Sequence, residues 1–115
     1  MTDLLAQKCV PCRGGLPPAT DAEIAALRPQ VPDWLLVDVD GIKRLRRAYP
    51  FKDFQTSMAF AQAVGDEAEA AGHHPILTIE WGKVAVEWWT HEIGGLHQND
   101  FIMAAKTDAV AKQLA

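Results

Sequence analysis

Two runs of alternating residues, joined by a short turn within residues 76–89, constrain the fold of this chain more than any other feature. The first run reads ILTIE and the second reads KVAVEWW, with Trp81-Gly82 between them. Alternation with a period of two on both sides of a tight turn is typical of an antiparallel β-hairpin. The second run gathers apolar residues on one face, namely Val84, Val86 and Trp88. This face has to be buried against other elements.

A second hairpin is predicted earlier in the chain. The run WLLVDV begins at Trp34, and GIKRLRRAY follows the turn signal Asp40-Gly41. In the second of these strands, alternation places three apolar residues on one face, which we expect to point inward: Leu45, Tyr49 and Phe51.

Helical segments flank both hairpins. Thr20 and Glu23 form a T-x-x-E capping box at the start of a short helix, which Pro29 ends. Asp53 is a good N-cap for a long helix, which Gly72 ends. The apolar residues of this helix recur at helical spacing, which predicts a buried stripe of Phe54, Met58, Ala61, Val64, Ala68 and Ala71. A last helix is expected from about Gln98 to Leu114, with Asp100 in its first turn.

The predicted element order, α-β-β-α-β-β-α, favours an α+β fold of two layers. In this fold, the helices lie on one face of a four-stranded antiparallel sheet. We assign residues 20–115 to this domain and residues 1–19, which contain several prolines and glycines, to an irregular N-terminal arm. The other sheet face would carry Trp88 or Trp89, depending on register, so we expect a homo-oligomer.

The composition excludes several classes of protein. The formal net charge is −4, and the only basic cluster, KRLRR at 43–47, would divide its charges between two faces of a strand, so no nucleic-acid partner is expected. No apolar run approaches the roughly 20 residues of a membrane-spanning helix. The N-terminus also lacks the basic and apolar regions of a secretory signal. We therefore expect a cytoplasmic protein with no membrane partner.

Cys9 and Cys12 form an isolated CxxC pair within the arm. A structural zinc site usually needs four Cys or His ligands, and the sequence has no second CxxC. An ordinary pair of thiols is the preferred interpretation, while a metal half-site and redox-labile thiols stay open.

Three of the four histidines lie at the ends of predicted elements. His73 and His74 precede the first strand of the later hairpin, and His91 follows its second strand. Counting outward from the turn, an antiparallel pairing brings His91 level with His73 and His74. Asp100 and Glu69 could reach the same rim of the sheet. We therefore expect the imidazoles to converge at one end of the sheet.

Convergent imidazoles have three interpretations. They can transfer protons, because free histidine titrates at about pH 6.5. They can bind a metal ion, although two adjacent histidines have backbones too close for easy joint ligation. They can also be structural, with His73 and His74 capping a helix end and His91 simply following a strand. The residues alone leave this choice open.

The spacing E-x3-HHP-x5-W-x9-H-x8-D, from Glu69 to Asp100, resembles the signature of the pterin-4a-carbinolamine dehydratases. The motif FKDF at 51–54 and the segments THE and GL within 90–96 agree with it. Trp34 resembles the tryptophan that this family carries in its first strand. The resemblance covers roughly residues 20–114.

The resemblance implies a small α+β dimer or tetramer that dehydrates 4a-hydroxytetrahydropterin to quinonoid dihydropterin. The reaction would recycle the pterin after aromatic amino-acid hydroxylation, without a metal or organic cofactor. The catalytic residues would be His73, His74 and His91, with Asp100 as their acidic partner. We expect His73 and His91 to transfer protons and His74 to orient the pterin or its hydroxyl. Substrate-binding roles would fall to Glu69, Trp34 and Trp81.

The sequence departs from the family pattern at His97, which stands where Ser or Thr is expected to cap the last helix. We therefore expect this helix to be less well capped. Two residues are also added between Trp34 and Phe51. The rival interpretation is an interaction module of the same fold, like a transcriptional coactivator, and a third is a metal-binding protein that uses Cys9, Cys12 and histidines.

Overall fold

The computed structural model describes residues 4–6 and 17–114, and it has the predicted order of elements. A short 3-10 turn, η1 (Leu4–Ala6), precedes α1 (Asp21–Leu27) and a second 3-10 turn, η2 (Arg28–Gln30). The strands are β1 (Leu35–Val39), β2 (Ile42–Pro50), β3 (Ile76–Glu80) and β4 (Lys83–Trp88). The long helices are α2 (Phe54–Ala71) and α3 (Gln98–Leu114). Among the described residues, no helix combines the length and apolar character needed to cross a bilayer.

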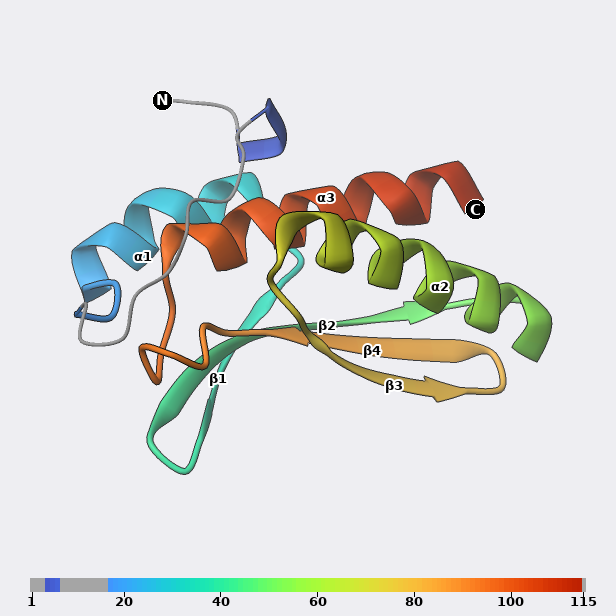
Figure 1. Ribbon diagram of the computed structural model, residues 1–115, viewed down its shortest axis with the longest axis horizontal. Coiled ribbons are helices and arrows are strands. Elements are labelled where there is room, and N and C mark those ends of the chain that lie inside the picture. The colour runs from blue at the N-terminus through green and yellow to red at the C-terminus, as the bar shows by residue number, and fades with distance from the viewer. Residues whose placement is uncertain (1–3, 7–16, 115) are drawn as a thin grey trace.

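The four strands form one antiparallel sheet in the order β1-β2-β4-β3. Both predicted hairpins are present, and β2 pairs with β4 to join them at the centre of the sheet. Ile76 pairs with Glu87, as counting from the turn predicts. Figure 1 shows the helices together on one face of the sheet. The predicted two-layer α+β fold is therefore confirmed.

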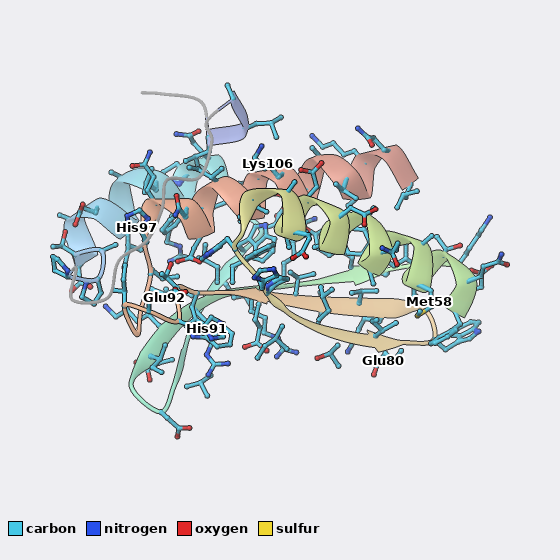
Figure 2. The ribbon with its side chains drawn as sticks, in the orientation of Figure 1. Met58, Glu80, His91, Glu92, His97 and Lys106 are labelled. Atoms are coloured by element: carbon cyan, nitrogen blue, oxygen red, sulfur yellow. The ribbon has the colours of Figure 1, made fainter. Side chains whose placement is uncertain are left out.

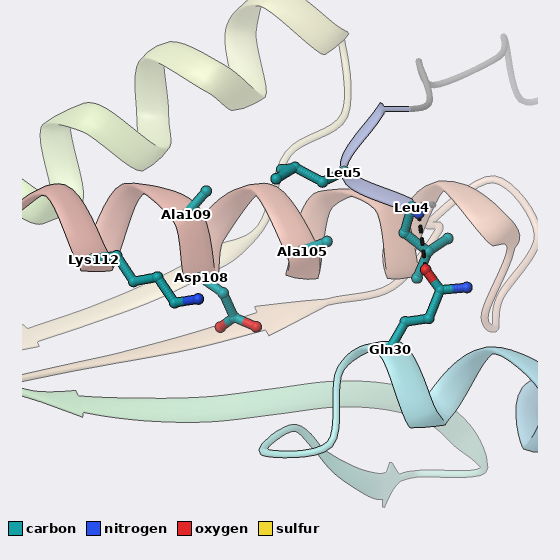
Figure 3. A pocket seen from close by; sticks show the side chains of 7 residues that line it. All are labelled: Leu4, Leu5, Gln30, Ala105, Asp108, Ala109 and Lys112. Atoms are coloured by element: carbon teal, nitrogen blue, oxygen red, sulfur yellow. Dashed lines mark hydrogen bonds between the residues drawn. The ribbon is translucent and has the colours of Figure 1, made fainter. Parts of the chain in front are cut away.

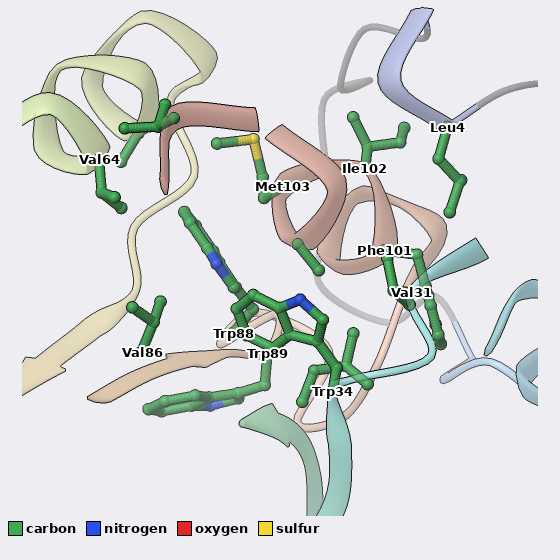
Figure 4. Packing of buried hydrophobic residues seen from close by; sticks show 14 of the residues in the cluster. Leu4, Val31, Trp34, Val64, Val86, Trp88, Trp89, Phe101, Ile102 and Met103 are labelled. Atoms are coloured by element: carbon green, nitrogen blue, oxygen red, sulfur yellow. The ribbon is translucent and has the colours of Figure 1, made fainter. Parts of the chain in front are cut away.

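The core lies between the sheet and the helices (Figure 4). Its largest side chains with almost no exposed surface include Trp34, Trp88, Phe60 and Phe101. Leu45 and Tyr49 of β2 point inward as predicted. Each buried aromatic side chain removes a large apolar area from water, at roughly 25 cal/mol per Å².

The predicted stripe of α2 is partly wrong. Phe54 and Met58 are 47% and 45% exposed, whereas Ser57 and Phe60 are fully buried. The buried face is instead made of residues 57, 60, 61, 64 and 68, which still follow helical spacing. Phe60 is buried because its ring packs against Tyr49 of β2 and against Phe51, with centroids 4.8 and 4.9 Å apart, and α2 also contacts α3. Met58 lies at the end of the molecule that also carries Glu80 (Figure 2).

The turn η1 belongs to the packed structure, although it precedes the predicted domain boundary at residue 20. Leu4 has no exposed surface and packs in the core, and its backbone N–H donates to Oε1 of Gln30 at 2.9 Å (Figure 3). A cavity of about 330 Å³ lies beside it, lined by Leu4, Leu5, Gln30, Ala105, Asp108, Ala109 and Lys112 (Figure 3). Cys9 and Cys12 lie outside the described residues, so the interpretation of that pair stays a prediction.

Candidate active site

The end of α2 delivers His73 into the molecule. Gly72 adopts the left-handed conformation, with a φ of 65°, and its N–H donates to the carbonyls of Ala68 and Glu69. The N–H of His73 donates to the carbonyl of Ala68 at 3.1 Å. This glycine-terminated helix end reverses the chain direction, so the next side chain points inward. His73 is 7% exposed.

His73 meets Asp100 at the start of α3. Its Nε2 lies 2.6 Å from Oδ1 of Asp100, which has no exposed surface. The other oxygen, Oδ2, accepts hydrogen bonds from the hydroxyl of Thr90 and the backbone N–H of His97, both at 2.9 Å. A buried carboxylate with several donors is held in one position, because each lost hydrogen bond to a charged group would cost about 1.5–3 kcal/mol.

Trp88 fixes the plane of the His73 ring. The two rings are stacked, with centroids 5.6 Å apart and planes inclined by 9°. Trp88 is itself held by a hydrogen bond from its Nε1 to the hydroxyl of Thr107 in α3, at 3.1 Å. His73 therefore has its orientation set by a carboxylate on one atom and an aromatic ring on one face.

His74 and Glu69 form a second pair at the surface. Nε2 of His74 lies 2.7 Å from Oε1 of Glu69, and the two side chains are 61% and 81% exposed. The pair depends only on the end of this helix, because Glu69 is in the last turn of α2 and His74 is the third residue after α2 ends. The predicted proximity of Glu69 to the histidines is thus present, but with His74 as its partner.

His91 packs against the opposite face of the sheet. Its ring stacks on Trp89, with centroids 4.2 Å apart, and the guanidinium of Arg44 lies 3.9 Å from the centroid of the same Trp89 ring. The imidazole of His91 and the guanidinium of Arg44 both lie about 4 Å from the centre of the Trp89 ring, where one face has room for only one of them. The indole of Trp89 therefore lies between the two groups. Arg44 also contacts Glu87 at 3.5 Å. The exposed His91 is thus held by an aromatic and cationic stack.

The structure brings the histidines to one end of the sheet, but their side chains lie on both faces instead of converging on one. Successive residues of a strand point to opposite faces, and Trp88 and Trp89 do so in Figure 4. The His73 ring stacks on Trp88 on the helix side of the sheet, and the His91 ring stacks on Trp89 on the other side. Within the described ranges, His91 makes no hydrogen bond to His73 or His74.

The two predicted tryptophans lie away from the histidines. Trp34 is 1% exposed, and its Nε1 donates to Oδ1 of Asp108, two turns after Asp100 in α3, at 3.0 Å. Trp81 is 72% exposed and sits in the β3–β4 turn, at the opposite end of that hairpin from His74. Neither position brings the indole to the His73–Asp100 pair.

The start of α3 is capped, although position 97 carries neither Ser nor Thr. Nδ1 of His97 accepts a hydrogen bond from the backbone N–H of Asn99 at 3.1 Å. An imidazole nitrogen can therefore take the place of the Ser or Thr hydroxyl. Among residues 4–6 and 17–114, no group of three or more His, Cys, Asp or Glu side chains could hold a metal ion.

Comparison with known proteins gives the family of this chain. Residues 17–110 match the family model of pterin 4 alpha carbinolamine dehydratase. The chain belongs to this family. Every motif position from Glu69 to Asp100 lies inside the matched region. The expectation of a dehydratase, a hydro-lyase, is confirmed at the level of the family.

Curated relatives of this dehydratase family member extend over nearly the whole chain. A protein of Microcystis aeruginosa is 56% identical, and the alignment covers 98% of this chain and 97% of the relative. A protein of Gloeobacter violaceus is 54% identical, with 97% of each chain covered. Their names are "Putative pterin-4-alpha-carbinolamine dehydratase", the second with the suffix 1.

Solved structures agree with the fold. The structure of a "transcriptional coactivator/pterin dehydratase" from Brucella melitensis has a TM-score of 0.73 and 31% identity, and the match covers 82% of this chain and 98% of the other. A pterin dehydratase-like RuBisCO assembly factor of the α-carboxysome has a TM-score of 0.58 and 20% identity. That match covers 69% of this chain and 89% of the other. At that identity, the second match shows the fold alone.

Sequence reasoning missed several residues around this dehydratase-family site. Thr90 and His97 hold Asp100, while Arg44 and Trp89 hold His91. The signal for Thr90 was available, because Thr90 precedes His91 and must share the face of Trp88. The Arg44–Trp89 contact depends on the pairing of β2 with β4, which the sequence does not specify.

Proposed function

We propose that this protein dehydrates 4a-hydroxytetrahydropterin to quinonoid dihydropterin by histidine general acid–base catalysis. The observation that carries the proposal is the buried His73–Asp100 pair beside the exposed His74–Glu69 pair, at the end of the sheet where His91 also lies. Family membership supplies the substrate class. The geometry supports proton transfer at this end.

The reaction needs two proton transfers. The 4a-hydroxyl takes up a proton and leaves as water, while a ring N–H loses its proton, so atoms and charge balance. One positioned acid and one positioned base each contribute about 10²–10⁴ in rate. Imidazoles suit both roles because histidine changes its charge near neutrality.

We assign His73 the role of base. If its Nε2–H donates to the Asp100 carboxylate, Nδ1 is the lone-pair nitrogen. Within the described residues, Nε2 alone makes a hydrogen bond, so Nδ1 is available for the ring N–H of the substrate. Asp100 then fixes the tautomer and stabilises the imidazolium that forms after proton transfer.

We assign His91 the role of acid. We assign His74, whose ring is held by the Glu69 carboxylate, the role of orienting the substrate. The rings lie on both faces of the sheet end, so a substrate that contacts all three has to lie across that end. The stack on Trp89 would hold His91 in place during proton donation. The substrate-binding roles of Trp34 and Trp81 stay predictions.

A coupled assay with phenylalanine hydroxylase tests the proposal. Decay of the 4a-hydroxypterin is followed with and without this protein, and with His73→Ala, His74→Ala and His91→Ala. Acceleration by the wild type and losses in the variants are expected. Glu80→Ala, at the far end of the hairpin (Figure 2), is the matched control. Unchanged rates in all three histidine variants would refute the assignment.

The proposal extends to a dimer or tetramer in the cytoplasm that serves an aromatic amino-acid hydroxylase. Leu35 and Ile76, on the face of the sheet away from the helices, are 62% and 38% exposed in the single chain, which favours association. A second candidate is an interaction module, favoured by the coactivator name of the Brucella relative. A folded wild-type protein that does not accelerate decay of the 4a-hydroxypterin would favour this second function.

A further inference from the structure

His97 makes hydrogen bonds to both Asp100 and Asn99 at the start of α3. The backbone N–H of His97 donates to Oδ2 of Asp100 at 2.9 Å, and Nδ1 of His97 accepts from the N–H of Asn99 at 3.1 Å. This is the arrangement of a capping box, with an imidazole in the place of the usual hydroxyl. Because Asp100 also contacts His73, the helix cap and the His73 contact share one carboxylate.

The cap requires one protonation state of His97. Nδ1 can accept a hydrogen bond only without a proton, so the ring is the neutral Nε2–H tautomer. A second proton would place a donor against the N–H of Asn99. It would also place positive charge at a helix N-terminus, where cations are unfavourable. A Ser or Thr cap has no such dependence on protonation.

We propose that His97 is a positioning residue that holds Asp100 against His73, and that protonation of His97 releases this hold. The inference deepens the proposed function and rests on it. His97 itself contacts neither His73 nor a reacting atom. It acts through the first turn of α3, where its backbone N–H holds the carboxylate of Asp100 and its ring holds the backbone of the preceding residue, Asn99.

The charged groups that face His97 come from two elements. A cavity of about 250 Å³ lies beside it, lined by Pro17, Pro18, Ala19, Thr20, Glu23, His97 and Gln98. Glu23 of α1 is the one acidic side chain in this lining, and its carboxylate accepts the N–H of Thr20 at 2.9 Å. The two charges beside the His97 ring are therefore the carboxylate of Glu23 and the partial positive charge at the N-terminus of α3. The carboxylate of Asp100 in α3 accepts the backbone N–H of His97.

The first experiment compares His97→Ala with His97→Ser, using two measurements that need no turnover. One is hydrogen exchange at the Asn99 amide, and the other is the nitrogen-bound proton resonance of His73 beside Asp100. His97→Ala is expected to lower protection of Asn99 about fivefold, the effect of a lost cap, and to shift the His73 resonance. His97→Ser, which restores an acceptor, is expected to return both towards wild type.

Asp53→Ala is the matched control for a general loss of helix capping. Oδ1 of Asp53 caps α2 by accepting the N–H of Thr56 at 2.7 Å, at the end of α2 away from His73. This variant should lose stability without shifting the His73 resonance. The inference is overturned if Asp53→Ala shifts that resonance as much as His97→Ala, or if His97→Ala leaves both measurements at wild-type values.

Acidification provides the second experiment and needs only folded proteins. When the solution is acidified so that imidazoles take up a second proton, protection of Asn99 should decrease in the wild type but stay constant in His97→Ser. Equal pH dependence in the two proteins would overturn the inference.

In the dehydratase assay, His97→Ala should reduce kcat by about tenfold, since small misplacement of a catalytic group has large effects. KM should change less, and His97→Ser should recover part of the rate. If the wild type has no dehydratase activity but His97→Ala still shifts the His73 resonance, the proposed function is refuted and the positioning role of His97 stands. If the wild type is active but His97→Ala leaves the His73 resonance unshifted, the positioning role is refuted and the proposed function stands.

Discussion

Nε2 of His73 lies 2.6 Å from Oδ1 of Asp100, although the two residues are 27 positions apart, with His73 just after α2 and Asp100 in the first turn of α3. The contact links the end of α2 to the start of α3. Both helix ends therefore have to be well defined for the pair to form. Gly72 defines the first end, and the hydrogen bonds of His97 with Asp100 and Asn99 define the second.

Asp100→Asn should lower kcat/KM by about 10²-fold while keeping the side-chain volume. The amide has one acceptor oxygen and one donor nitrogen. Whichever way it is placed, the NH₂ group faces either His73 or the donors Thr90 and His97. The coupled pterin assay and circular dichroism measure rate and fold. Asp66→Asn, on the exposed side of α2, is the control, and an equal rate in both variants would contradict this role of Asp100.

Trp89→Leu should reduce activity several-fold more than Trp89→Phe, because an aromatic ring keeps a platform for His91 and Arg44. The leucine variant removes the stack and lets the exposed imidazole rotate, and misplacement of this kind can cost up to about 10²-fold. Steady-state kinetics of both variants test this. Equal activity of the Leu and Phe variants would show that the stack does not position His91.

Much of the fold could be predicted from periodicity. The alternation around Trp81-Gly82 fixed the hairpin, and the turn position fixed its register, since a slip of one residue would exchange the two faces. The stripe of α2 was less well predicted. Phe54 and Met58 have the right spacing for burial, but which face of a helix is buried depends on the neighbouring helix as well as the sheet.

The candidate site could be predicted only in part, for reasons of geometry. Counting brings His73, His74 and His91 level along the sheet, but it does not give the direction of side chains beyond the strand ends. Trp34 and Trp81 came from the resemblance alone, and both lie away from the His73–Asp100 pair.

Asp108→Ala should destabilise the fold by about 3 kcal/mol, because three donors converge on one oxygen of this carboxylate. Oδ1 accepts from Nε1 of Trp34 at 3.0 Å, from Arg47 at 2.8 Å and from the hydroxyl of Tyr49. Urea denaturation measures the loss. Asp33→Ala is the control, because Asp33 also contacts Arg47, at 3.5 Å, but is 70% exposed. It should cost less than about 0.5 kcal/mol, and equal losses would contradict the central role of Asp108.

Tyr49 should keep its proton in alkaline solution until the chain unfolds. Burial, followed by the hydrogen bond to Asp108 and the charge of that carboxylate, raises the pKa of the Tyr49 hydroxyl far above its usual value. The unfolded chain releases this proton at about pH 10, whereas the folded chain retains it. The contribution of Tyr49 to stability is therefore complete below that pH and decreases as the pH rises above it.

The single tyrosine of the chain makes this prediction directly measurable. Tyrosinate absorbance reports Tyr49 alone, and tryptophan fluorescence reports unfolding in the same sample. We expect the two alkaline transitions to coincide, at a higher pH than in the same protein dissolved in denaturant, where Tyr49 titrates at about pH 10. Full tyrosinate absorbance at that pH in a protein with native fluorescence would contradict the prediction, because it would mean that the hydroxyl is neither buried nor held by Asp108.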